Sequence, residues 1–218
     1  MKQTTYIIIT LLLLFNVYGC NRSKDQDGNS FKTVKIGEQV WMAENLNVEH
    51  YRNGDPIPQV KESAKWKKLE TGAWCYYNND STNCEKYAKL YNWYAVIDPR
   101  GLAPEDWHIA SNDDWKKLND YLGGYEVSGG KLKDKNSWEI SNTEVTNSSG
   151  FGAFAGGNRY GVGEYFDVGL KGSFWTSKSH DEYHADLYYL SYNNSFLLDA
   201  YFRKSMGLSV RCIKDKSK

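Results

Sequence analysis

Two histidines four positions apart are the first residues in this sequence whose spacing suggests chemistry. His180 and His184 enclose Asp181, Glu182 and Tyr183. A zinc-protease helix also carries two histidines one turn apart, but it places Glu directly after the first one as the general base. Asp181 stands at that position, is one carbon shorter, and lies between two predicted strands. We therefore expect a solvated loop here and not a zinc site.

The other histidines make no better case for catalysis. His108 lies between Trp107 and Ile109, where we expect a hydrogen-bonded structural histidine, and His50 lies in a polar loop without a visible partner. No Ser/His/Asp or Cys/His set stands in a recognisable sequence context. The sequence therefore predicts a protein that is not an enzyme.

One loop offers several oxygen atoms of the kind that calcium prefers. Asn78, Asn79, Asp80 and Asn83 are the candidate ligands for Ca²⁺. Asn and Asp also form turns by bonding to the backbone nearby, which explains the same residues without a metal. We prefer the turn, with no cofactor, and keep calcium as the alternative.

The start of the chain is an address signal. Lys2 precedes an apolar run from Tyr6 to Phe15, shorter than the roughly 20 residues that a membrane-spanning helix needs. This pattern is typical of a secretory signal peptide. Residues 17–20 resemble the bacterial lipoprotein cleavage box, which implies that Cys20 carries lipid and anchors the protein in the bilayer. The alternative is an ordinary secretory signal followed by an incidental cysteine.

A polar segment follows the predicted lipidation site. Residues 21–30 contain no apolar side chain, so we expect a solvated tether. Residues 24–27, Lys-Asp-Gln-Asp, resemble the acidic surface-export signals of Bacteroidota lipoproteins. This favours an outer-membrane lipoprotein displayed on the cell surface, with the periplasmic face as the alternative. The expected organisation is a signal peptide at 1–19, a lipidated tether at 20–30, one domain at 31–214 and a polar tail at 215–218.

The charge balance argues against nucleic acid as a partner. The 218 residues include 27 Lys and Arg against 27 Asp and Glu, and phosphate binding needs a concentrated basic surface. A chain of this length buries roughly 70% of its unfolded surface, which supports one folded core.

Export also bears on the cysteines, because disulfides form outside the cytosol. Cys75 and Cys84 are nine positions apart, so we expect a local disulfide between them. A bridge from Cys212 to either one, or no bridge at all, are the alternatives.

Local patterns predict a mixed α+β fold. Val34 to Met42 alternate around Gly37 and Glu38, which predicts a hairpin with a type II′ turn. Capping signals predict two helices, one from about Thr82 to Ala95 and one that begins at Ser111 and ends at Gly123. Short aromatic or β-branched runs predict an antiparallel set of strands at residues 173–177, 185–192, 196–202 and 208–213.

Glycine-rich segments lie between these elements. Residues 123–130 and 150–172 predict ordered loops in which aromatic side chains alternate with glycines. In residues 186–192, alternation sends Tyr188 and Tyr192 to one face of a strand, where the rings would be displayed if the other face is core. Tyr160, Tyr165, Tyr188 and Tyr192 are our candidate ligand-binding residues.

A set of motifs carries a family resemblance over residues 31–214. In chain order they are IGEQVWMAENL at 36–46, CYYNND at 75–80, YAKLYNWY at 87–94, WHIAS at 107–111, FWTS at 174–177 and LSVRC at 208–212. The chain resembles the Fibrobacter succinogenes major paralogous domain family. Three positions depart from the family pattern: Ala88 and Asp106, where glycine is common, and Ala110, where proline is common.

The resemblance implies a C-type-lectin-like fold with two helices on short antiparallel sheets and long glycine-rich loops. Formylglycine-generating enzymes share that grouping, but their late pair of active-site cysteines has only Cys212 as a counterpart here. The calcium-dependent lectin motifs are absent as well. We therefore expect a non-catalytic binding or adhesion module, first for a glycan or polysaccharide. The alternative is a structural or protein-interaction module of a surface complex.

Overall fold

A hairpin near the start of the chain confirms the prediction made from its alternating residues. The computed structural model describes residues 23–139 and 145–216. Strands β3 (Thr33–Ile36) and β4 (Gln39–Met42) pair with Ile36 opposite Gln39, which leaves a two-residue loop. Gly37 in that loop has a φ of +60° and Glu38 has a negative φ, as a type II′ turn requires.

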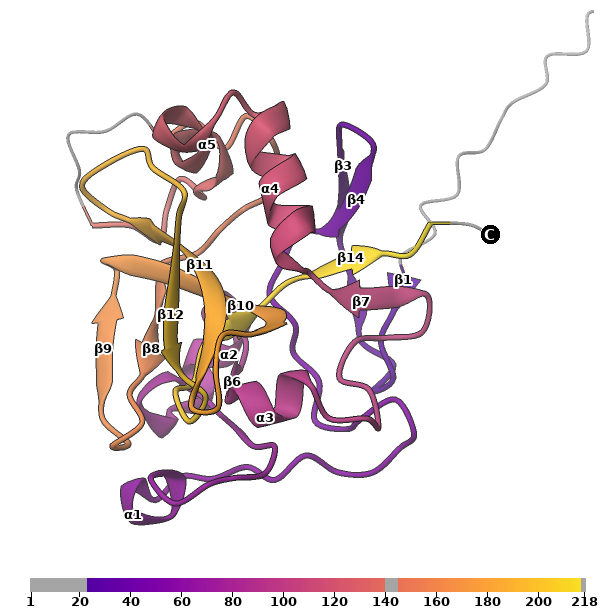
Figure 1. Cartoon of the computed structure of the whole chain (residues 1–218), viewed down its shortest axis with the longest axis vertical. Helices are drawn as coiled ribbons and strands as arrows, with labels where there is room; N and C mark the ends of the chain where they lie inside the picture. The colour runs from indigo at the N-terminus through magenta and orange to yellow at the C-terminus, as the bar shows by residue number, and fades with distance from the viewer. Residues whose placement is uncertain (1–22, 140–144, 217–218) are drawn as a thin grey trace, which may run out of the picture.

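The C-terminal strand joins the two ends of the domain. Strand β14 (Cys212–Lys214) lies between β4 and β7 (Trp107–Ile109), so this sheet has the order β3-β4-β14-β7. Figure 1 shows the yellow β14 beside β7, which is nearly half the chain away in sequence. The sheet therefore cannot form until both ends of the chain have been made.

The larger sheet confirms the strands predicted at residues 173–177, 185–192 and 196–202. It also contains two strands, at 156–159 and 165–168, inside the segment 150–172 that we expected to be a loop, so that expectation is wrong for these residues. The set is not wholly antiparallel, because the strands at 156–159 and 209–210 pair in parallel with the strand at 171–179.

The order of this sheet is β12-β11-β10-β8-β9, with β13 paired in parallel to β10. The strands are β8 (Gly156–Arg159), β9 (Tyr165–Val168), β10 (Lys171–Ser179), β11 (His184–Ser191), β12 (Leu198–Arg203) and β13 (Ser209–Val210). Together with the helices, these sheets establish the α+β class.

Helix α4 (Asn112–Tyr121) begins and ends where the sequence predicted. Ser111 accepts a hydrogen bond from the Asp114 amide, and the Asp114 carboxylate accepts one from the Ser111 amide, which completes a capping box. The helix stops before Gly123, whose φ is +101°. Trp115 on its buried face stacks on Tyr188 of β11, with ring centroids 5.3 Å apart.

The segment after α4 is a helix and not the glycine-rich loop that we expected. Helix α5 (Tyr125–Leu132) contains Gly129, where an added Cβ would lie 2.4 Å from the Phe196 carbonyl oxygen. The glycine therefore serves a close approach of the helix to the loop between β11 and β12. Composition alone did not distinguish this role from loop formation.

The single helix predicted from Thr82 to Ala95 is also wrong. Helix α2 (Cys84–Tyr87) ends at Ala88, whose φ is +60°, and α3 (Trp93–Val96) starts after it with Asn92 as its cap. Strand β6 (Leu90–Tyr91) separates the two helices and pairs with β5 (Trp74–Cys75). Burial of Leu90 and Tyr91 in strand pairing overrides the helical spacing of the apolar residues.

The expected count of two helices therefore does not hold. The described part of the chain contains five α-helices, of which α1 (Ser63–Trp66) is the first, and the short 3₁₀ turns η1 (Tyr77–Asn79) and η2 (Ser81–Asn83). Within the described ranges, no helix has both the length and the apolar character to cross a bilayer.

Most of the predicted tether is folded against the domain. Cys20 and its neighbours lie outside the described residues, but strands β1 (Ser23–Lys24) and β2 (Ser30–Phe31) form a small antiparallel pair. Between them, Gln26 donates to the His50 and Leu102 carbonyl oxygens, and an Asp27 carboxylate oxygen lies 2.6 Å from His50 Nδ1. Residues 23–30 are therefore docked on the domain and are not a free tether, although Lys24 and residues 28–30 stay exposed. His50 has a partner, contrary to our expectation.

Buried cations hold the long loops in place. Arg211 is fully buried and donates to the carbonyl oxygens of Met42, Phe151 and Gly152 at 2.6–2.9 Å, and to the Asn45 side chain at 2.8 Å. Its guanidinium lies over the Phe151 ring, 4.3 Å from the centroid. Burial lowers the pKa of Arg211 to about 9. These bonds satisfy carbonyl groups that no strand or helix would satisfy.

The three described cysteines are free, so the Cys75–Cys84 disulfide and its Cys212 alternatives are not formed. Cys75 packs in a cluster around Trp66, Cys212 belongs to a different core cluster, and the Cys84 sulfur lies 3.4 Å from the Asn47 side-chain amide. Each thiol thus has its own surroundings. Burial raises the pKa of both the Cys75 and Cys212 thiols.

We expect Arg211→Met to lower the free energy of unfolding by about 3 kcal/mol or more, because the carbonyl groups it serves would stay buried without donors. Urea unfolding followed by tryptophan fluorescence measures this. Lys35→Gln, an exposed change in β3, is the matched control and should stay within about 0.5 kcal/mol of the wild type. Equal midpoints for both variants would contradict the role of Arg211.

Alkylation of the native protein should modify Cys84 and spare Cys75 and Cys212, because thiolate formation and access are both suppressed by burial. The measurement is iodoacetamide labelling read by peptide mass spectrometry, in a Cys20→Ser background that removes the fourth cysteine. A peptide pair linked through Cys75 and Cys84 in the unreduced digest would show that the disulfide forms instead.

Candidate functional site

His180 lies in the turn between β10 and β11, and His184 is the first residue of β11. His180 Nδ1 is 2.9 Å from an Asp186 carboxylate oxygen, and His184 Nδ1 is 2.9 Å from the Asp181 carboxylate. The expectation of a loop between strands is confirmed. Within the described ranges, no group of three or more His, Cys, Asp or Glu side chains could hold a metal ion.

An exposed tyrosine lies against both of these rings. Tyr201 of β12 stacks on His180, with centroids 4.0 Å apart and planes 10° apart, and meets the edge of His184 at 5.7 Å. The pairing of Tyr201 with Asp186 across β11 and β12 fixes this position. Tyr201 nevertheless remains 54% exposed. The two histidines therefore orient a ring that still presents surface to solvent.

A second exposed ring comes from the turn between β8 and β9. Tyr160 is 39% exposed and packs edge-on against Phe166, with centroids 4.8 Å apart. Its amide donates to the Glu164 carbonyl oxygen at 2.8 Å, and the Gly163 amide donates back to the Tyr160 carbonyl oxygen at 2.8 Å. This turn is therefore closed by its own backbone bonds.

The buried side chain of Arg159 is hydrogen-bonded to the turn between β8 and β9. It donates to the carbonyl oxygens of Gly163, Val60 and Lys61 at 2.6–3.1 Å. Its guanidinium lies over the Trp66 ring, 4.3 Å from the centroid, and the Trp66 indole donates to the Ser205 carbonyl oxygen. The β8–β9 turn, α1 and the segment after β12 are thus tied into one rigid unit.

These elements enclose a hollow that we name the Tyr160–Tyr201 cleft. Its cavity volume is about 620 Å³. Its lining combines aromatic and apolar side chains with cationic and hydroxyl groups, and consists of Lys67, Tyr160, Gly161, Val162, His184, Tyr201, Phe202, Arg203, Ser205 and Met206. A volume of this size accommodates a small sugar.

Of the four tyrosines singled out in the sequence, only Tyr160 lines this cleft. Tyr165 donates its hydroxyl to Asn79 Oδ1 at 2.8 Å and packs edge-on against Tyr77. Tyr188 is stacked on Trp115, and the amide of the half-buried Tyr192 donates to the Leu170 carbonyl oxygen. The structure therefore does not bring the four rings together on one face.

Strand β11 shows why the alternation argument failed. Leu187 belongs to one core cluster and Leu190 to another, with Tyr189 packed on the first and Tyr188 on the second. Both faces of the strand are therefore covered, so neither displays a row of rings. Alternation separates the two faces correctly but does not say whether a second layer covers the outer one.

Sequence reasoning missed Tyr201 and Arg203. The alternation of residues 198–203, together with antiparallel pairing to the predicted strand at 185–192, contained the signal. In that register His184 lies opposite Arg203, and Asp186 lies opposite Tyr201. The register itself is set by the length of the loop after Ser191, and composition does not fix that length.

The candidate calcium residues act in the turn that we preferred. Asp80 accepts hydrogen bonds from the amide and hydroxyl of Thr82, Asn79 donates to the Lys61 carbonyl oxygen, and Asn83 donates to the Tyr77 carbonyl oxygen. Asn78 has a φ of +54°. Local turn bonding is confirmed for Asp80 and Asn83, whereas the Asn79 side chain bonds to a segment 18 residues earlier.

His108 is a hydrogen-bonded structural histidine, as expected. Its two ring nitrogens lie 2.6 Å from Asp215 and 3.2 Å from Asp114. These carboxylates, Asp114 first, raise the pKa of His108 despite its partial burial. The ring thus links the C-terminal segment to the start of α4.

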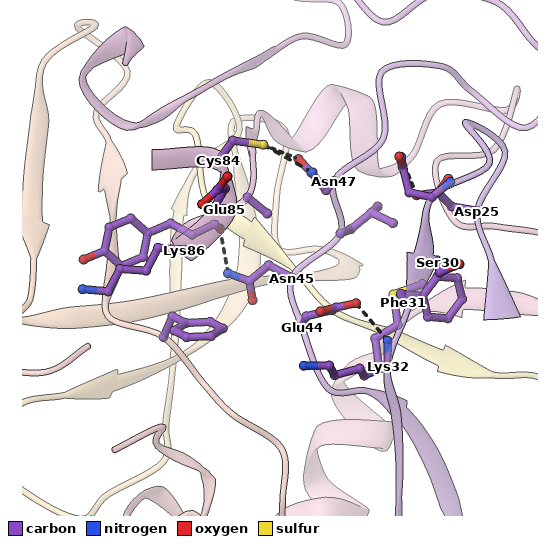
Figure 2. Close-up of a pocket in the computed structure, with 16 residues that line it drawn as sticks. Asp25, Ser30, Phe31, Lys32, Glu44, Asn45, Asn47, Cys84, Glu85 and Lys86 are labelled. Atoms are coloured by element: carbon purple, nitrogen blue, oxygen red, sulfur yellow. Dashed lines mark hydrogen bonds between the residues drawn. The ribbon is translucent and has the colours of Figure 1, made fainter. Parts of the chain in front are cut away.

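A second hollow, with a volume of about 400 Å³, lies between the N-terminal segment and α2. Figure 2 shows that polar side chains lining this hollow form hydrogen bonds with one another or with nearby backbone groups. Glu44 accepts a hydrogen bond from the Lys32 amide, and Asn45 donates one to the Tyr87 carbonyl oxygen. The Asn47 side-chain amide donates one to the Cys84 sulfur. Acidic and basic groups are mixed along the hollow. We interpret this hollow as a place where the N-terminal segment and α2 pack together. The Tyr160–Tyr201 cleft is the candidate site because exposed rings and cations line it.

Comparison with known proteins identifies a family and nothing closer. No curated protein and no solved structure matches the chain. The family model described as Fibrobacter succinogenes major domain matches residues 34–214.

Two departures from the family pattern now have a structural meaning. Ala88 and Asp106 stand where the family commonly has glycine, and both have positive φ, at +60° and +62°. They mark turns that the fold requires and do not touch the cleft. The match spans most of the 218 residues, and the chain therefore belongs to the Fibrobacter succinogenes major domain family.

Proposed function

We propose that this protein is a lipid-anchored cell-envelope protein that acts as a non-catalytic binding or adhesion module and takes a glycan in the Tyr160–Tyr201 cleft. The observation that carries the proposal is a pair of partly exposed rings that line the same hollow. Tyr160 comes from the turn between β8 and β9, and Tyr201 comes from β12. Tyrosine rings stack on the apolar faces of sugars, and their hydroxyl groups reach polar partners.

The surroundings of the rings suit this role. Ser205, His184 and Arg203 line the same cleft and offer hydrogen-bonding groups for sugar hydroxyls. Arg159 and the two histidines hold the rings in place before any ligand arrives. Binding to a preformed site loses less side-chain entropy, which favours weak ligands such as sugars.

The anchor is the second part of the proposal. Lipid on Cys20 would place the protein in the outer membrane, displayed on the cell surface. The docked β1–β2 pair begins at Ser23, so the folded domain would be held within a few residues of the bilayer. The C-type-lectin-like fold implied by the family resemblance belongs to this proposal as well, and nucleic acid is not among the partners.

Glycan-array binding by the purified protein tests the site. We expect Tyr160→Ala and Tyr201→Ala each to weaken binding by about 1–2 kcal/mol, roughly 5- to 30-fold, because each removes a stacking surface. Tyr121→Ala is the matched control, since Tyr121 is 66% exposed and does not line the cleft. If the protein bound no glycan on the array, the result would favour the alternative, a structural or protein-interaction module.

Cell fractionation tests the anchor. Cys20→Ser removes the only atom that could carry the lipids, so we expect the protein to move from the membrane fraction to the soluble fraction. Cys84→Ser serves as the control and should leave the distribution unchanged. If the Cys20→Ser protein remained in the membrane fraction, the lipid anchor would be wrong.

A further inference from the structure

The Tyr160–Tyr201 cleft has a one-sided charge. Lys67, directly after α1, and Arg203, at the end of β12, are exposed side chains in its lining, and His184 also lines it. Among the described residues that line it, none is acidic. This bias contrasts with the whole chain, in which acidic and basic residues balance.

Two carboxylates beside the histidines, Asp181 and Asp186, are bonded to other groups of the protein. Desolvation opposes ionisation of Asp181, but hydrogen bonds from the His184 ring and from the Tyr183 and His184 amides lower the pKa of its carboxyl to about 2. Asp186 accepts from Asn112 and lies within 3.3 Å of Lys178 Nζ. Both acids carry negative charge, but their bonds are directed to His184, Lys178, His180 and Asn112 and not to Lys67 or Arg203.

Lys204, a third cation near the cleft, is bonded to backbone groups of the protein. Lys204 Nζ donates to the carbonyl oxygens of Asp181 and Glu182 and lies over the Trp93 ring. Glu164 and Glu182 are exposed on neighbouring turns but outside the lining. Lys67 and Arg203 are thus the charged groups that face a ligand in this cleft.

We propose that the ligand is an acidic glycan, in which uronic acid carboxylates meet Arg203 and Lys67 while a sugar ring stacks on Tyr160 or Tyr201. This inference rests on the proposed function and names the class of sugar. An arginine side chain binds a carboxylate through two parallel hydrogen bonds, whereas lysine offers a point charge. The two cations come from separate segments, so they suit a chain with more than one carboxylate.

Titration calorimetry of the detergent-purified full chain tests the charge requirement. The probes are polygalacturonate, polymannuronate and hyaluronate, each paired with its methyl ester, which keeps the sugar backbone and removes the charge. We expect at least one acid to bind about 10-fold or more tightly than its ester, and its affinity to fall as salt rises from about 0.05 to about 0.5 M.

Variants connect this preference to the cleft. Arg203→Gln and Lys67→Gln should each remove most of the preference for the acid over the ester, and both side chains are exposed, so the fold should be kept. Lys35→Gln, an exposed cation on β3 outside the lining, is the control and should bind as the wild type does. Polyglutamate tests whether charge without a sugar is enough.

Each outcome separates the inference from the proposed function. Equal binding of acid and ester, or binding of neutral glycans alone, overturns the acidic class and leaves glycan binding standing. Equal binding of polyglutamate shows that charge alone is recognised and overturns both the acidic glycan and the glycan site. Failure to bind any glycan, acidic or neutral, overturns both. Unchanged preference in Arg203→Gln and Lys67→Gln places the acidic site elsewhere and overturns the assignment to this cleft.

Discussion

The fold depends on buried cations that collect backbone carbonyl groups. Four Lys and Arg side chains are buried in the described part of the chain, namely Lys89, Lys133, Arg159 and Arg211. Each donates to carbonyl oxygens of loops or chain segments. Long irregular segments carry many carbonyl groups that no helix or strand pairs, and leaving them buried and unbonded would cost several kcal/mol. A side chain with several donors satisfies two or three of them at once.

Aromatic rings make this burial tolerable. Arg159 lies over Trp66 and Tyr165, Arg211 over Phe151, and Lys133 over Trp138, with distances of 4.3–4.9 Å to the ring centroids. The electron-rich faces of the rings partly replace the water that the cations lose. Burial lowers the pKa of Lys133 to about 8.

One of these buried cations, Arg159, also positions the candidate site. Arg159 reaches the turn that carries Tyr160 and the segment that leads to α1 and Lys67, so two walls of the cleft share one buried donor. Tyr201, on a third wall, is fixed independently by β-sheet register and by two histidines. Hydrogen bonds and ring packing therefore position the walls of the cleft, while its rings and cations remain open to solvent.

The sequence by itself determined the features that depend on neighbouring residues. Gly37 set the hairpin turn, Ser111 with Asp114 set the start of α4, and the ordered motifs set the family, because turn and capping bonds close within a few positions. Tertiary structure decided the rest. Gly129 lies in a helix that closely approaches the Phe196 carbonyl group, and the helix predicted across Leu90 is broken by strand pairing. Tyr160 and Tyr201 line one cleft only through sheet order and register. Each of these features depends on contacts with residues far away in the sequence. The spacing of neighbouring residues does not specify which distant segment will pack or pair with them.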